Sequence, residues 1–156
     1  MRFFVCAAGT VDRAVYLGIP VEAVEALMVY GGEARGAVLR ERGADGSGGD
    51  TYFSLPRFFH AGEGILRYGI ILKNRDSRAA HDSAAARGSV GRNILLVPVV
   101  EREADFSDGE IHRLPGILAG AGAVFITGIR FDDGGMTLFI DPLLLVETML
   151  KQEAPV

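Results

Sequence analysis

The sequence predicts a mostly β fold in the form of a small barrel. Short apolar or alternating runs are separated by Gly, Pro, Asp and Ser, which is the pattern of closely spaced strands. Asp132-Asp133-Gly134-Gly135 is a strong hairpin signal, because the turn needs residues that accept positive φ. Long strand-helix-strand spacings are few, so a parallel doubly wound sheet is disfavoured and a barrel is favoured.

The first strands are expected near the amino-terminal end. Arg2–Ala7 is short and apolar, and Arg13–Ile19 is rich in β-forming residues, with Gly9 to Asp12 as a hairpin turn. Pro20 offers no amide to a ladder and therefore ends the second strand.

The segment after Pro20 is predicted to make one helical turn and then to continue extended. Val21, Val24 and Leu27 recur at three-residue spacing, which suits a helical turn, and Leu27–Tyr30 can follow as a strand. Residues 31–50 are dominated by Gly, Arg, Glu, Asp and Ser, so they are expected to form a flexible loop.

Three strand-like runs occupy the middle of the chain. They are Thr51–Leu55, Leu66–Lys73 and Ile94–Val100. The last is nearly continuous Ile, Leu and Val, as in a strand buried on both faces, and Pro98 predicts that it lies at an edge or a bulge. Residues 74–92 lack a core-facing stripe and are expected to form a second surface loop.

The last third predicts a hairpin followed by a helix. Val124–Arg130 and Met136–Ile140 are the hairpin strands on either side of the Gly-containing turn. Asp141 stands at the N-cap position and Pro142 at the first helical position, so Leu143–Lys151 is expected to be helical.

Length and charge restrict the class of protein. The 156 residues suit a single domain spanning 1–156, and 16 basic against 20 acidic side chains give a net charge of −4. This charge disfavours a broad nucleic-acid face. One cysteine, Cys6, excludes an internal disulfide, and apolar stretches are too short to span a membrane, so a cytoplasmic protein is expected.

No catalytic or metal-binding constellation is recognisable, so the sequence predicts no enzyme activity, no cofactor and no metal. His60, His81 and His112 lack the paired spacing of zinc ligands. The Gly-rich segments match neither the dinucleotide fingerprint nor the P-loop. Cys6 lies in a predicted strand and is interpreted as a small buried hydrophobe. This combination favours a β-rich protein that presents surfaces to other proteins.

The order of these segments resembles the CheW-like family, the adaptors that couple chemoreceptors to the histidine kinase CheA. Most of the weight rests on Gly18-Ile19-Pro20-Val21-Glu22-Ala23-Val24 and on the closing segments around Phe125–Ile129 and Met136–Leu145. Further matches are Phe3–Val5, Thr51–Leu55, Ile94–Glu101 and Leu114-Pro115. The resemblance implies two small five-stranded SH3-like β-barrels packed together, with short helices including a C-terminal one.

The resemblance also implies partners and site residues. It implies binding to the regulatory domain of a CheA-type kinase and to chemoreceptor cytoplasmic tips, through Val24, Ala26, Leu27 and Arg42. The sequence departs from the family: its Asn-Leu-Arg-Gly segment is reduced to Arg40–Gly43, followed by an insertion, and Ala26 and Ser54 stand at usually acidic positions. Two alternatives therefore stay open: a diverged regulator that has lost receptor coupling and binds another protein, and a small-molecule-binding barrel.

Overall fold

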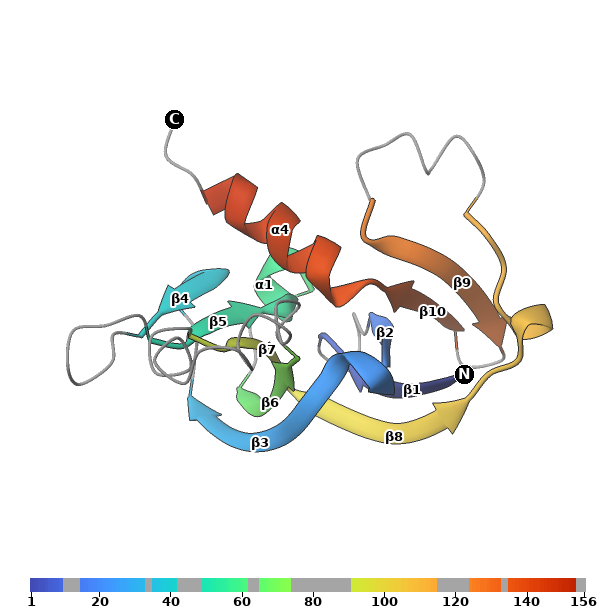
Figure 1. Cartoon of the computed structure of the whole chain (residues 1–156), viewed down its shortest axis with the longest axis horizontal. Coiled ribbons are helices and arrows are strands. Elements are labelled where there is room, and N and C mark those ends of the chain that lie inside the picture. The colour runs from blue at the N-terminus through green and yellow to red at the C-terminus, as the bar shows by residue number, and fades with distance from the viewer. Residues whose placement is uncertain are drawn as a thin grey trace, which may run out of the picture.

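Two five-stranded sheets carry the fold in the computed structural model (Figure 1). The structure describes residues 1–9, 15–32, 35–41, 49–61, 65–73, 91–114, 124–132 and 135–153. The predicted mostly β class is confirmed, and each sheet contains one parallel pair of strands among antiparallel ones.

The first sheet combines strands from both ends of the chain. Its order is β8-β1-β2-β10-β9, and β2 runs parallel to β10. The predicted strand Arg2–Ala7 is confirmed as β1, and the last hairpin is confirmed by the pairing of Asp132 with Gly135. The bounds are β1 Arg2–Ala7, β2 Tyr16–Pro20, β8 Val99–Asp105, β9 Ile126–Asp132 and β10 Gly135–Ile140.

The second sheet is built from the middle of the chain. Its order is β3-β6-β7-β5-β4, and β5 runs parallel to β7. The bounds are β3 Val24–Gly32, β4 Val38–Arg40, β5 Thr51–Ser54, β6 Leu66–Leu72 and β7 Asn93–Val97. Short helical pieces flank the sheets: η2 Val21–Ala23, α1 Leu55–Phe58 and η4 Asp108–Glu110.

Some sequence-based boundaries were wrong. The predicted loop over 31–50 contains the end of β3 and the short strand β4, whose pairing with β5 is non-local. The predicted helical turn is shorter, because Val24 already begins a strand. Residues 42–48 and 74–90, which carry most of the two predicted loops, lie outside the described residues.

Pro98 has a different role from the predicted edge or bulge. It separates β7, which is inside the second sheet, from β8, which is at the edge of the first. The chain thus passes from one sheet to the other at a residue that cannot continue a ladder.

One hydrophobic cluster is shared by the two sheets and the C-terminal helix α4, Pro142–Glu153. β1 contributes Cys6, β2 contributes Leu17, and β7 contributes Leu95, all of them fully buried. Leu145 enters the same cluster from α4. Each sheet therefore covers the other, and α4 is packed against the cluster that both form.

The opposite faces of the two sheets are also partly buried. Ile94 and Leu96 of β7 belong to a small cluster within the second sheet, whereas Leu95 points to the shared cluster. In the first sheet, Phe3 and Phe139 pack edge to face with ring centroids 4.7 Å apart. Burial on both faces explains why β7 is continuously apolar, as the sequence predicted.

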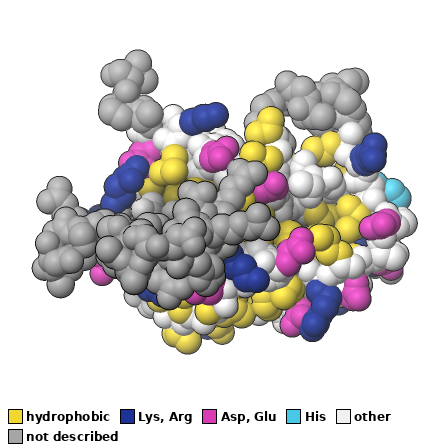
Figure 2. All heavy atoms as spheres, viewed as in Figure 1, with side chains coloured by type: hydrophobic (Ala, Val, Ile, Leu, Met, Phe, Trp, Pro, Cys, Tyr) yellow, Lys and Arg dark blue, Asp and Glu magenta, His cyan; other side chains and the backbone are white. Residues whose placement is uncertain are grey.

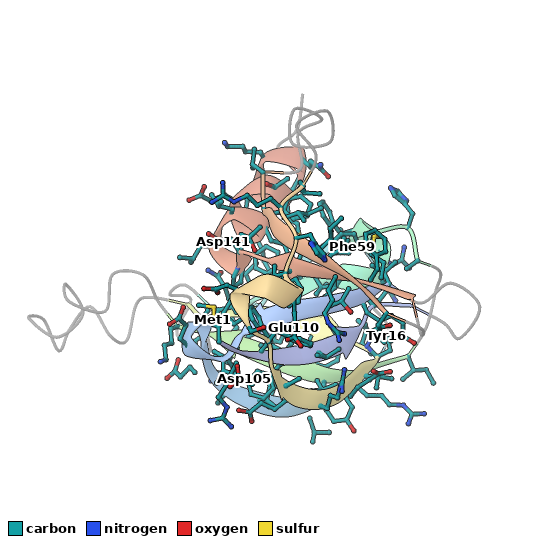
Figure 3. The ribbon with its side chains drawn as sticks, turned by 90° about the vertical axis from the view of Figure 1, so that its right-hand side faces the viewer. Met1, Tyr16, Phe59, Asp105, Glu110 and Asp141 are labelled. Atoms are coloured by element: carbon teal, nitrogen blue, oxygen red, sulfur yellow. The ribbon has the colours of Figure 1, made fainter. Side chains whose placement is uncertain are left out.

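The start of α4 is fixed by the cap that the sequence predicted. Asp141 Oδ1 accepts hydrogen bonds from the backbone amides of Leu143 and Leu144, at 3.0 and 3.3 Å. Pro142 occupies the first helical position, where no amide is missed. Figure 3 shows Asp141 where the helix meets the end of β10.

The chain beyond β8 turns back onto the first sheet. A capping box between Ser107 and Glu110, which is labelled in Figure 3, holds the short helix η4. His112 then exchanges two backbone hydrogen bonds of 2.8 Å with Ile129. This bridge covers part of the outer edge of β9. Gly128 permits the close approach, because a Cβ there would lie 2.5 Å from Ile111 Cγ2 and 3.1 Å from His112 O.

We propose that residues 1–156 fold as one domain through the shared cluster. Leu95→Ala is expected to lower the free energy of unfolding by about 2–5 kcal/mol, because it leaves a cavity. Hydrogen-exchange protection should fall by the same factor in β1 as in β6. Loss confined to the second sheet would show that the sheets unfold independently. The exposed change Phe131→Ala should alter stability by less than about 0.5 kcal/mol.

Gly128→Ala is expected to destabilise the protein by about 1–3 kcal/mol, because the added methyl overpacks the contact with Ile111 and His112. Gly109→Ala is the matched control, since a Cβ at that glycine meets nothing within 4 Å. Urea unfolding of both variants measures the difference. Equal stability of the two variants would mean that the bridge to β9 tolerates a side chain.

Candidate protein-interaction surface

Strand β3 places three of the four predicted site residues together. It is an outer strand of the second sheet, and among the described residues only β6 pairs with it. Val24, Ala26 and Leu27 lie in its first half. Arg42 lies outside the described residues, so the structure does not relate it to them.

The three residues differ in exposure. Val24 pairs with Leu72 and is 9% exposed within the shared cluster, so packing accounts for its apolar character. Ala26 is exposed, and Leu27 is 43% exposed although its partner Ile70 is fully buried. Their predicted role in partner binding stays a prediction.

Leu27, Val29 and Tyr68 form an apolar strip on one face of the second sheet. Val29 and Tyr68 are direct cross-strand partners, and Leu27 is two residues from Val29, so the three side chains share a face. The same face is buried further along, where Ile70 enters the shared cluster. Val29 is 83% exposed and Tyr68 is 37% exposed. The strip is thus the uncovered continuation of the face that packs between the sheets.

The surface view agrees with this arrangement. Figure 2 shows hydrophobic side chains along the lower edge of the molecule, where Figure 1 places β3. Sequence analysis missed Val29 and Tyr68. Alternation of Leu27 and Val29 within the extended segment was the available signal for Val29, whereas Tyr68 joins only through the register of β3 and β6.

An ion pair holds the ends of two neighbouring strands of the same sheet. Arg92 Nη2 donates to Asp50 Oδ2 at 2.8 Å and Arg92 Nε donates to Asp50 Oδ1 at 3.2 Å, while the Arg92 amide reaches the same carboxylate at 3.1 Å. The backbone oxygen of Arg92 accepts from the Thr51 amide at 2.9 Å. These contacts set the start of the parallel pair β5 and β7.

The pKa values of Asp50 and of the neighbouring Tyr52 are shifted from their ordinary values. The hydrogen bond from Arg92 lowers the pKa of Asp50 below its ordinary value. Burial, together with a hydrogen bond to the Glu41 carboxylate, raises the pKa of Tyr52 to about 12. At neutral pH this end of the sheet therefore carries a paired Asp50 carboxylate and a neutral phenol.

Within the part of the chain that the structure describes, no cluster of potential metal ligands is found. Burial, and secondarily Glu101, raises the pKa of Cys6 to about 12, so its thiol is neutral, and the prediction of a small buried residue is confirmed. Among the described residues no three His, Cys, Asp or Glu side chains lie close enough to hold a metal ion. His81 lies outside the described residues.

An apolar pocket of about 370 Å³ opens beside the first sheet. Phe3, Phe139 and Ile140 supply apolar walls, and Glu22 and Asp141 add carboxylates. Asp141 already caps α4. The pocket is separate in the fold from the apolar strip, which belongs to the second sheet.

No described helix has the length and apolar composition needed to cross a membrane.

Asp50→Asn is expected to remove a stabilisation that depends on pH. Because the folded-state pKa of Asp50 is lowered, the carboxylate stabilises the fold above its unfolded pKa of about 3.8, and this contribution is lost as pH falls through the folded-state value. The pair is partly exposed, so the difference at pH 7 should be below about 1 kcal/mol.

Urea unfolding of the wild type and the variant between pH 7 and strongly acidic pH measures this difference. Arg92→Gln should abolish the same pH-dependent component, because it removes the cation that lowers the pKa. A constant difference between wild type and Asp50→Asn across the range would contradict the assignment.

Comparison with known proteins identifies the fold. No family model matches the chain, and no curated protein matches it. Among solved structures, the scaffolding protein TtCheW from Thermoanaerobacter tengcongensis is similar, with a TM-score of 0.54 and 14% sequence identity. The match covers 90% of this chain and 85% of that one, so it extends over both sheets. The chain therefore has the CheW-like fold that the order of its segments predicted.

Proposed function

We propose that this chain, with its CheW-like fold, is an adaptor of bacterial chemotaxis signalling that binds the regulatory domain of a CheA-type histidine kinase and chemoreceptor cytoplasmic tips. The observation that carries the proposal is the agreement of fold with a scaffolding protein over 90% of the chain. A scaffold of this kind acts by binding other proteins in the cytoplasm, and this function requires no reaction at any of its side chains.

The apolar strip on β3 and β6 supplies the surface that this function needs. Exposed apolar and aromatic side chains gain the most from being covered by a partner, and Tyr68 adds a hydroxyl that can be paired at the rim. Ala26 pairs with Ile71 and is exposed on the opposite face of β3 from Leu27. Val24 supports this part of β3 from the core side.

A diverged regulator without receptor coupling is the second candidate. Ala26 and Ser54 replace the acidic residues of the resembled family, and Ser54 is buried with its amide donating to Ala37 O at 2.7 Å. Ser54 therefore has a backbone role in the sheet and no surface through which to meet a receptor. The small-molecule alternative stays a prediction, for which the apolar pocket beside Phe139 would be the site.

Isothermal titration of the chain with a CheA-type regulatory domain and with a receptor tip tests the proposal. Leu27→Asp should weaken kinase-domain binding at least tenfold, about 1.4 kcal/mol, because it places a charge in the apolar strip. Phe131→Asp, on the first sheet and also exposed, should leave binding unchanged.

The two arms of the titration separate the candidates. Binding of both ligands supports the adaptor, and binding of the kinase domain alone shows that receptor coupling is lost while kinase docking is kept. Binding of neither ligand by a folded wild-type chain would overturn the proposal.

A further inference from the structure

Three of the four sheet edges carry features that prevent pairing with another strand. The edge strand β8 alternates acidic side chains at Glu101, Glu103 and Asp105. The outer edge of β9 is bridged by His112. β4 is only three residues long. Charge, coverage and shortness are the means by which natural sheets avoid edge-to-edge association.

The fourth edge, β3, is the least protected within the described residues, with one charged side chain and a register shift toward each end. It is nine residues long, and no other described strand pairs with its outer side. Glu25, at a bulge, is its one charged residue. From Ala26 to Gly32 the strand has neither a charge nor a proline. Between the register shifts at Val24/Ala26 and Val29/Gly32, the pairing with β6 is regular from Ala26 to Val29, and no described strand pairs with the outer side of this stretch.

We infer that β3 pairs in antiparallel fashion with β3 of a second copy of this chain, so that the two second sheets join into one continuous sheet. A two-fold axis at Met28 would place Leu27 opposite Val29 of the other copy, and Ala26 opposite Tyr30. Glu25 would face Gly31, so the two carboxylates would not oppose each other.

This register is self-complementary in its side chains as well as its backbone. Leu27 and Val29 share a face, so both of their cross-strand pairs bury apolar area on the same side of the joined sheet. Tyr68 lies beside Val29 and extends that surface in each copy. Isologous pairing of one patch with itself closes after two copies and does not grow into a fibre.

Light scattering after size exclusion measures the association with this chain alone. The wild type should have about twice the monomer mass, and Val29→Lys should have the monomer mass, because the ammonium would be placed against Leu27 of the other copy. Phe131→Lys is the matched control: Phe131 is 65% exposed on the first sheet, and this variant should stay dimeric. Circular dichroism checks that each variant is folded.

Paired charges test the register itself. Leu27→Glu combined with Val29→Lys should restore the dimer, since each Glu would face a Lys of the other copy, and high salt should weaken it. Leu27→Lys combined with Val29→Lys should be monomeric. A restored dimer in the first double variant and a monomer in the second support the axis at Met28.

Other outcomes overturn the inference. A wild type that is monomeric up to about millimolar concentration, or a folded Val29→Lys variant that stays dimeric, shows that β3 does not pair with itself. A monomer that still binds the kinase domain would overturn the dimer and leave the proposed function standing. A dimer that binds neither kinase nor receptor would overturn the proposed function and leave the pairing of β3 standing.

Discussion

The whole architecture depends on the hydrophobic cluster that both sheets share. Leu17 of the first sheet and Leu95 of the second are fully buried in it, and Leu145 closes it from α4. A five-stranded sheet of such short strands has too little apolar area on one face to offset the entropy of ordering its chain. Packing the two sheets on one cluster provides that area. The chain crosses from one sheet to the other at Pro98, directly between β7 of the second sheet and β8 of the first.

Local signals predicted the elements whose cause is local. The capped helix follows from Asp141 and Pro142, the last hairpin from its Gly-containing turn, and two-sided burial of β7 from its continuous Ile, Leu and Val. β4 was not predictable in this way, because three residues acquire strand geometry only through pairing with β5. Pro98 was assigned to an edge or bulge because the sequence does not show that the chain changes sheets there.

The residues of the candidate surface also divide into those that local sequence signals predict and those that only strand pairing reveals. Leu27 was identifiable from its segment, since the CheW-like resemblance covers the start of β3. Tyr68 is distant in the sequence and joins Val29 only through the register of β3 with β6. Val24 could not be separated from Leu27 by residue type, because both are apolar. Their difference, 9% against 43% exposure, arises from where the first sheet stops covering the second.

Burial on both faces of the sheets also determines where function can be located. Phe3 and Phe139 are buried on the face of the first sheet that points away from the shared cluster. Ile94 and Leu96 are buried on the corresponding face of the second sheet, so apolar packing occupies these two faces as well. The strand edges and the margins of the sheet faces are then the surfaces that the proposed docking would use. Among the edges, charge on β8 and the His112 bridge on β9 direct association away from the first sheet. The uncharged run of β3 beside its exposed apolar strip is what supports the proposal that this fold binds its partners through the second sheet.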